Sequence, residues 1–281
     1  MTAEEEQEFY QIANSMRFRD MTPAQIVAIL AGEGTYLASI STLYRILRKR
    51  KALEHRQQSK KPRVTRPGHT YYVTGPDQVY SWDITWLKTD VRGIFLYAYT
   101  IIDLFDRSLV GWSIEENESD EHATRLFARL VRDRGVCPKI VHADNGHPMR
   151  GVTLAVFLDS LMISRSHSRP RCSNDNAHIE SYHKTMKYTV GYPQMFTSID
   201  HARSWYADFV HWYNTEHLHS ALGYVTPQQR RSGEAEAIYA TRNETIANAR
   251  KKNPLRWRSN RTYSYGSKPV SFVYRPVIQA A

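Results

Sequence analysis

The sequence has few cysteines and no long run of apolar residues. Two cysteines, Cys137 and Cys172, in 281 residues are too few for a disulfide scaffold, and they lack the paired spacing of zinc ligands. A membrane-spanning helix needs about 18 or more apolar residues in a row, so we predict no membrane partner. The acidic start of the chain is not typical of a signal peptide. These absences together predict a reducing, cytoplasmic setting.

Positive charge is concentrated in two segments. The net charge is +10, and 41% of the residues are hydrophobic, which is a globular value. Residues 41–72 carry a net charge of +9 and residues 242–281 a net charge of +8, whereas residues 1–40 and 73–241 carry −4 and −3. A solvated surface usually mixes both signs, so blocks of one sign predict a polyanionic partner, nucleic acid. Basic linkers without a partner are the alternative.

Residues 1–55 are predicted to form a small helical module. Thr22-Pro23 supplies a hydroxyl N-cap and a proline in the first turn of a helix. Ser39 or Ser41 opens a second helix after a connection that contains glycine. This pattern fits a DNA-binding helix-turn-helix, although a generic helical hairpin has the same pattern. Three cations on the open side of the second helix are predicted to contact DNA: Arg45, Arg48 and Lys49.

Residues 73–232 are predicted to form an α/β domain. Apolar and polar residues alternate across 79–88, which predicts a half-buried strand. The remaining elements are predicted as strands at 94–103 and 108–116, a helix at 120–134, a strand at 139–143, a helix at 152–162, a strand at MISRSH (162–167), a helix that carries Glu180 and a helix at 199–217. This order is typical of an α/β domain rather than of an all-helical regulator.

Basic segments without clear periodicity flank this domain. Residues 56–72 contain two prolines and many cations, and they are predicted to be a linker that follows a phosphate backbone. Residues 233–281 are predicted to be a basic tail, in which SYGSKPVSFVYRP forms a short hairpin.

Two aspartates are candidates for a common site. Asp83 lies in the middle of the first predicted strand, where it has no turn to cap and where an uncompensated buried charge costs several kcal/mol. Asp144 follows the strand KIVHA, and a strand-end aspartate usually caps a turn or a helix. If the two strands pair, the carboxylates lie side by side and one pKa rises, unless a divalent metal holds them together.

Glu180 is the third candidate. Asn176, Glu180, Lys184 and Lys187 follow one another at spacings of four, four and three residues, so they form one polar stripe of a helix. A solvent-exposed Glu–Lys pair, with plain surface lysines, is the alternative interpretation of this stripe. Between Asp144 and Glu180 lie 35 residues.

In these motifs the sequence resembles the DDE transposase and retroviral integrase superfamily, whose third acid follows the second at this interval. It resembles more closely the OrfB-type transposases of bacterial insertion sequences that move by copy-out, paste-in transposition. The matching motifs are WDITWL, HADNGHPMRG and SRPRCSNDNAHIESYHKTMK around the three acids, then WYNTEHLHSALGYVTPQQR and the start MTPAQIVAIL…STLYRILR. The resemblance covers residues 20–232 and leaves the C-terminal tail without a counterpart.

This resemblance implies an RNase H-like fold, the integrase catalytic core, and phosphoryl transfer with two Mg²⁺ ions, for which Mn²⁺ would substitute. Asp83, Asp144 and Glu180 would be the catalytic residues and metal ligands. Asp83 would bridge both ions, and each of the other two would hold one. We expect the position of Glu180 to depend on bound DNA. Four neighbours are predicted to contact DNA or its phosphates: Asn145, Asn176, Lys184 and Lys187.

The resemblance further implies a transposase active in DNA transposition, integration and recombination. It would nick the ends of its mobile element to free a 3′-hydroxyl and transfer that strand to target DNA. The implied partners are double-stranded terminal repeats, target DNA, at least a second copy of the chain, and an upstream reading-frame product. Because the chain begins at Met1, we expect the downstream product alone, associated with the nucleoid when bound to DNA. A non-catalytic DNA-binding assembly or regulatory factor and a structure-selective nuclease are the alternatives.

Overall fold

The alternating stretch forms the central strand of a sheet. The computed structural model describes residues 1–53, 70–146, 148–168, 176–257 and 263–274. In it, the stretch is strand β2 (Val79–Lys88). Tyr80 and Trp82 are fully buried on one face of the sheet, and Ser81 and Thr85 are buried on the other. The predicted alternation is therefore confirmed.

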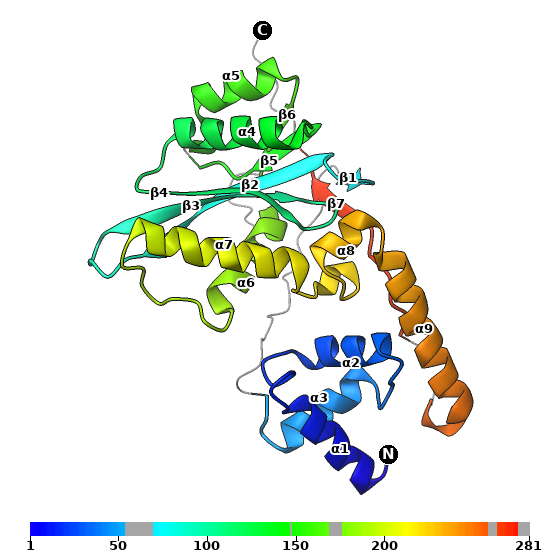
Figure 1. The fold of residues 1–281 in the computed structure, drawn as a ribbon. Coiled ribbons are helices and arrows are strands. Elements are labelled where there is room, and N and C mark those ends of the chain that lie inside the picture. The colour runs from blue at the N-terminus through cyan, green and yellow to red at the C-terminus, as the bar shows by residue number, and fades with distance from the viewer. Residues whose placement is uncertain (54–69, 147, 169–175, 258–262, 275–281) are drawn as a thin grey trace. The chain divides into compact units, whose positions relative to one another are not determined.

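Five strands form one mixed sheet in the order β4-β3-β2-β5-β6 (Figure 1). Within this sheet β2, β3 and β4 form an antiparallel meander, and β5 and β6 add to it in parallel. This order and these directions are those of an RNase H-like fold, as predicted. The bounds of the other four strands are β3 Phe95–Asp103, β4 Leu109–Glu115, β5 Ile140–Ala143 and β6 Ser164–His167.

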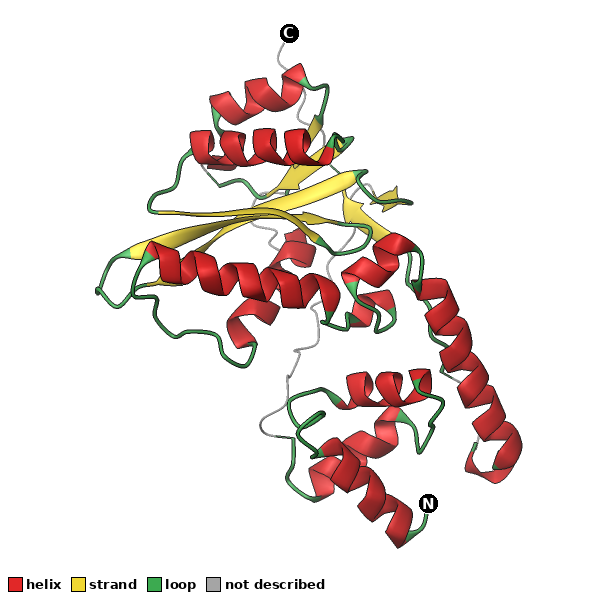
Figure 2. Cartoon of the chain, viewed as in Figure 1, coloured by secondary structure: helices red, strands yellow, loops and turns green. Residues whose placement is uncertain are grey.

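Helices cover both faces of this sheet (Figure 2). Apolar residues of α4 and α5 pack on the face that carries Trp82, and apolar residues of α6 and α7 pack on the opposite face. The bounds are α4 Asp120–Arg134, α5 Val152–Ser160, α6 Ala177–Tyr188 and α7 Ile199–Thr215, with a short 3-10 helix η1 at Pro148–Arg150. The predicted helices all form, with small differences at their ends.

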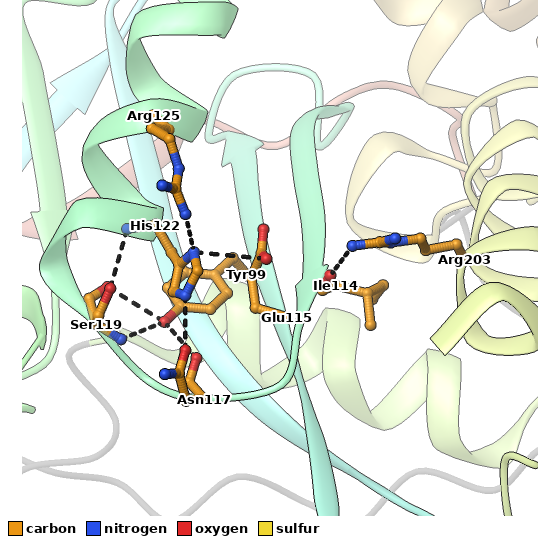
Figure 3. Close-up of polar contacts among 8 residues, drawn as sticks. All are labelled: Tyr99, Ile114, Glu115, Asn117, Ser119, His122, Arg125 and Arg203. Carbon is orange, nitrogen blue, oxygen red and sulfur yellow. Dashed lines mark hydrogen bonds and ion pairs between the residues drawn. The ribbon is translucent and has the colours of Figure 1, made fainter. Parts of the chain in front are cut away.

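A polar cluster sets the turn from β4 into α4 (Figure 3). The Ser119 hydroxyl caps the helix by accepting the N–H of His122, and the Ser119 N–H donates to the Tyr99 hydroxyl at 2.7 Å. The His122 ring lies 3.4 Å from a Glu115 carboxylate oxygen and 2.7 Å from the side-chain oxygen of Asn117. Local capping therefore explains why α4 begins where the sequence predicts it.

A second, two-stranded sheet joins distant parts of the chain. β1 (Thr70–Val73) pairs antiparallel with β7 (Val270–Val273). The predicted hairpin at SYGSKPVSFVYRP is therefore wrong, because its strand pairs with β1 and not with the residues that precede it. Residues 56–69 of the predicted linker lie outside the described part of the chain, and residues 70–72 are in a strand.

The chain divides into two compact units, residues 1–63 with 218–268, and residues 64–217 with 269–281. The first unit contains three N-terminal helices, of which the first was not predicted. Thr22 caps the second through a capping box, and Ser39 caps the third. The bounds are α1 Ala3–Ala13, α2 Pro23–Gly32, α3 Ile40–Lys49, α8 Pro227–Ser232 and α9 Ala235–Lys252, with 3-10 helices at Ser220–Leu222 and Pro254–Arg256.

The predicted boundary between the catalytic domain and the tail lies between residues 232 and 233. The compact units instead change between residues 217 and 218 and again between 268 and 269. Much of the predicted tail is the helix α9, whose Ala235, Tyr239 and Ile246 are buried. They pack in one cluster with Ala28 and Ala31 of α2, together with residues of the 218–225 stretch. Apolar contacts therefore place 218–268 in the unit of the N-terminal helices. None of the helices in the described part combines the length and apolar character that a membrane crossing requires.

Candidate active site

Parallel pairing of β2 and β5 brings the two aspartates to the same edge of the sheet. The paired positions end at Ser81 and His142. Asp83 and Asp144 each lie two residues beyond that last pair, and side chains two apart in a strand share a face. The pairing on which the sequence analysis made the common site conditional is thus present, and it places the two carboxylates at one level of neighbouring strands.

Glu180 reaches this region from the first turns of α6. The helix packs against β2 and buries Ile179, Tyr182 and Met186, the stripe that the sequence predicts. Glu180 itself is exposed beside that stripe. Burial raises its pKa, and the nearby Asp144 carboxylate raises it further. The helix thus brings the third acid within electrostatic range of the second.

The electrostatics of Asp83 connect all three acids. Burial raises the pKa of Asp83 to about 7, with Asp144 and Glu180 adding to the increase, while the Ile84 N–H and Lys187 oppose it. Among the described residues, Asp83 forms no ion pair with an Arg or Lys; its neighbour in the salt-bridge geometry is His183. In that same part of the chain, no three His, Cys, Asp or Glu side chains are gathered closely enough to ligate one ion. The acids are therefore mutually repelling neighbours rather than a closed ligand set.

Asp144 also shapes the turn that follows it. Its Oδ1 accepts the N–H of Gly146 at 2.7 Å, so the turn-capping role expected of such an aspartate is present. A Cβ on Gly146 would lie 3.0 Å from this same oxygen and 3.0 Å from Sδ of Met149, so a larger residue would crowd the turn. The Asn145 side-chain amide donates to the Ser168 carbonyl at 2.6 Å. That bond joins the turn to the end of β6, in addition to any DNA contact predicted for Asn145.

Asn176 occupies the N-cap position of α6 without capping it by a side-chain hydrogen bond. Its Oδ1 instead accepts the hydroxyl of Ser81 at 2.5 Å, and the residue is buried. Its Nδ2 has no hydrogen-bond partner within the described residues. Asn176, a member of the predicted polar stripe, thus connects the start of α6 to Ser81 of β2, which lies two residues before Asp83.

His183 is a site residue that the sequence analysis missed. Its Nδ1 lies 3.5 Å from Oδ2 of Asp83, and burial lowers the pKa of His183 to about 3, so the ring is neutral. The signal was its spacing, because His183 follows the buried Ile179 by four residues and Glu180 by three. A histidine on that side of the helix therefore faces β2.

The predicted cations are exposed. Lys184 and Lys187 follow Glu180 on α6, and neither forms an ion pair with another described residue. Burial lowers the pKa of Lys187; Asp83 opposes this decrease and Lys88 adds to it. In the other unit, Arg45, Arg48 and Lys49 lie on the open side of α3, where Lys49 also pairs with Glu6 at 3.2 Å.

Two family models of the integrase core domain match this part of the chain, one at residues 73–173 and one at residues 161–227. Together they span the sheet and all three acids, and more than half of the chain. Residues 73–227 are therefore an integrase core domain. Through this domain the chain belongs to the integrase core family, and over a similar length it is similar to transposases of insertion sequences.

Relatives from two bacteria are similar to this chain. Transposase InsF for insertion sequence IS3fB of Escherichia coli is 30% identical over 161 residues, which cover 57% of this chain and 55% of the relative. The transposase of insertion sequence element IS904 of Lactococcus lactis is 29% identical over 160 residues, covering 56% of this chain and 62% of the relative. The chain thus matches little more than half the length of these relatives.

Solved structures of two viral integrases are similar as well. The HTLV-2 integrase catalytic core domain in complex with magnesium, in its dimeric form, is 17% identical with a TM-score of 0.42, over 56% of this chain and 97% of that one. A chain of the simian T-cell lymphotropic virus intasome in complex with the PP2A regulatory subunit B56 gamma is 16% identical with a TM-score of 0.46, over 74% of each chain.

Proposed function

We propose that this protein is a metal-dependent DNA transposase that nicks the ends of its mobile element and transfers the freed 3′ ends to target DNA. The observation that carries the proposal is the register of β2 and β5, which sets Asp83 and Asp144 side by side with Glu180 in electrostatic range. A non-catalytic DNA-binding factor would have no use for three acids that repel one another. It is the alternative that the experiment below must exclude.

The donor set fits divalent metal ions. All three groups are carboxylates, the hard oxygen ligands that Mg²⁺ and Mn²⁺ take. The raised pKa values of Asp83 and Glu180 reflect desolvation and repulsion that a bound dication would offset. Two such ions would supply an activated water or 3′-hydroxyl and stabilise the leaving oxygen. Asp83, Asp144 and Glu180 would hold these ions. Glu180 would complete the set when DNA is bound.

The chain's other polar residues would hold the DNA in place. Lys184 and Lys187 are exposed and without ion-pair partners among the described residues, so their charges are available to phosphates. The Asn176 amide would orient a phosphate or a water near Asp83. In the other unit, α2 and α3 would act as the helix-turn-helix, with Arg45, Arg48 and Lys49 toward the terminal repeats.

The assembly would contain more than one copy of the chain. Bringing two element ends together requires at least a dimer, and an upstream reading-frame product would join it at the terminal repeats. The relatives are bacterial, so we place the reaction in the cytoplasm, on the nucleoid.

A strand-transfer assay tests this function. The protein is incubated with labelled DNA carrying the repeats that flank its gene, in Mg²⁺, Mn²⁺ or Ca²⁺, and the products are separated on a denaturing gel. We expect new joined products in Mg²⁺ and Mn²⁺. Binding without any cut would support the regulatory factor, and cutting of any sequence without joining would support a structure-selective nuclease.

Replacing Lys184 or Lys187 by Ala is expected to weaken DNA binding and make it less dependent on salt. Each lost phosphate contact should reduce the slope of log K against log [salt] by about 1. The measurement is a filter or fluorescence titration at several salt concentrations. Lys139→Ala is the matched control, because Lys139 is an exposed lysine at the opposite end of β5. A slope equal to that of the control would show that Lys184 and Lys187 are surface lysines that make no contact with phosphates.

A further inference from the structure

The strand β7 comes from near the end of the chain, yet it belongs to the unit of the catalytic sheet. It pairs with β1 in the register Tyr72–Ser271 and Tyr71–Phe272. Val270 and Phe272 are buried in the same hydrophobic cluster as Ile179 and Met186 of α6. The small sheet of β1 and β7 therefore shares a core with the helix that carries Glu180.

A hydrogen bond joins β7 to the first turn of α6. Nε2 of His178 donates to the carbonyl of Ser271 at 3.1 Å, and His178 lies two residues before Glu180. The start of α6 lacks a side-chain cap, because the Asn176 oxygen accepts the Ser81 hydroxyl instead. Orphan N–H groups at a helix start leave that turn weakly held on its own. The first turn of α6 is thus held by bonds to β2 and to β7.

The next residue of β7 contacts the strand of the second acid. The rings of Phe272 and His142 contact each other in an edge-type arrangement, with centroids 5.1 Å apart and planes at 62°. His142 lies two residues before Asp144, and its Nδ1 is 3.0 Å from the Ser166 hydroxyl on β6. Neighbouring residues of β7, Ser271 and Phe272, therefore contact the segments that lead into Glu180 and Asp144.

We propose that β7 is a positioning element of the active site, which holds the start of α6 and the end of β5 in register so that Glu180 meets Asp83 and Asp144. The inference rests on the proposed function for its catalytic consequence. Ser271 and Phe272 touch no substrate in this role; they act through His178 and His142. This gives the C-terminal strand a part in catalysis that the sequence alone left open.

His178→Leu and His178→Gln test the contact with Ser271. Leu removes the donor at similar bulk, whereas Gln retains an N–H that reaches the carbonyl. Loss of a hydrogen bond made directly to a metal ligand typically costs roughly 10–100-fold in metal affinity or activity. The His178 bond acts on Glu180 through the first turn of α6, so we take the lower end of that range. We therefore expect His178→Leu to lower Mn²⁺ affinity of the full chain, measured by calorimetry, and the turnover of strand transfer by about tenfold or more, with DNA affinity unchanged. His178→Gln should restore both.

Hydrogen exchange provides a readout that requires no catalysis. Amides of the first turns of α6 should exchange faster in His178→Leu than in wild type, while those of α7 stay unchanged. His211→Leu, at an exposed histidine of α7, is the matched control. Phe272→Leu tests the other contact and should lower Mn²⁺ affinity in the same direction, even if His178→Leu folds poorly.

The outcomes separate this inference from the proposed function. Wild-type Mn²⁺ affinity and α6 exchange in both His178→Leu and Phe272→Leu would overturn the positioning role. A loss of DNA binding and thermal stability equal to the loss of metal affinity, with no recovery in His178→Gln, would also overturn it, because it would indicate a purely structural contact. If wild type binds Mn²⁺ but joins no DNA, the proposed function fails while the metal and exchange measurements still decide the role of β7.

Discussion

Replacing Asp83 by Asn is expected to abolish strand transfer while leaving DNA binding near the wild-type value. The two side chains have nearly the same shape, but the amide carries no charge for a divalent ion. Removing one member of a catalytic group that acts as a unit costs roughly a thousandfold or more in turnover. The measurement is single-turnover joining of labelled ends in Mg²⁺, beside a binding titration in Ca²⁺.

The stability of this variant should separate a catalytic acid from a structural one. Burial and the Asp144 and Glu180 charges raise the pKa of Asp83, so its charged form is unfavourable in the folded protein. Asp83→Asn removes that unfavourable charge, and we expect unfolding by urea near neutral pH to show equal or greater stability. A structural ion pair would behave in the opposite way, because its loss leaves a charge unpaired.

Asp144→Asn and Glu180→Gln should show the same loss of joining, and combining any two should add little to it. Asp90→Asn is the matched control, because Asp90 is an exposed acid in the loop after β2. An acid whose amide variant retains substantial strand transfer does not belong to the site. A wild-type rate in all three would leave the carboxylates without a catalytic role.

Local patterns explain how much of the catalytic unit could be predicted. The alternation across 79–88 separates Trp82 from Asp83 because successive side chains of a strand point to opposite faces. Ser119 and Gly135 delimit α4 through an N-cap and a left-handed C-cap, and both signals are local in sequence. The order of elements allowed the first and fourth predicted strands to pair but did not require it, and the observed pairing is what brings Asp83 beside Asp144.

Contacts between distant segments explain what could not be predicted. β1 and β7 are four residues each and lie far apart in the sequence, so neither has a periodic pattern long enough to identify its partner. α9 has apolar residues that become informative only when α2 is known to pack against them. The spacing of His183 indicates the side of the helix on which it lies, but a lone histidine in a buried stripe does not indicate that an acid lies opposite it.

The hydrogen bonds of the polar side chains could not be predicted from the sequence either. Asn145 and Asn176 were assigned to DNA from their places beside the acids. The structure gives their amides internal partners, Ser168 and Ser81. Hydrogen-bond partners depend on how loops approach one another, and neither loop has a pattern from which that approach follows. The acids were predictable because the strands and the helix that present them have such patterns.

Replacing Gly151 by Ala is expected to have the largest effect on stability in the catalytic unit. Gly151 lies between the turn after Asp144 and the start of α5, whose Thr153 N–H donates to Oδ2 of Asp120 at 3.1 Å. A Cβ at Gly151 would lie 2.2 Å from the Cβ of Asp120 and 2.4 Å from that oxygen. Overpacking of this kind costs about 1–3 kcal/mol or more, and the displaced hydrogen bond about 1 more.

Urea unfolding of Gly151→Ala should therefore show a loss of about 3 kcal/mol, and Gly111→Ala, whose added carbon would make only ordinary contacts, a much smaller loss. A double-mutant cycle identifies the cause. Asp120→Gly removes the Cβ that the new methyl would strike, so Gly151→Ala should cost far less in that background. Asp120→Ala retains this Cβ and should give little relief. Equal costs in both backgrounds would show that Asp120 is not what requires a glycine at 151.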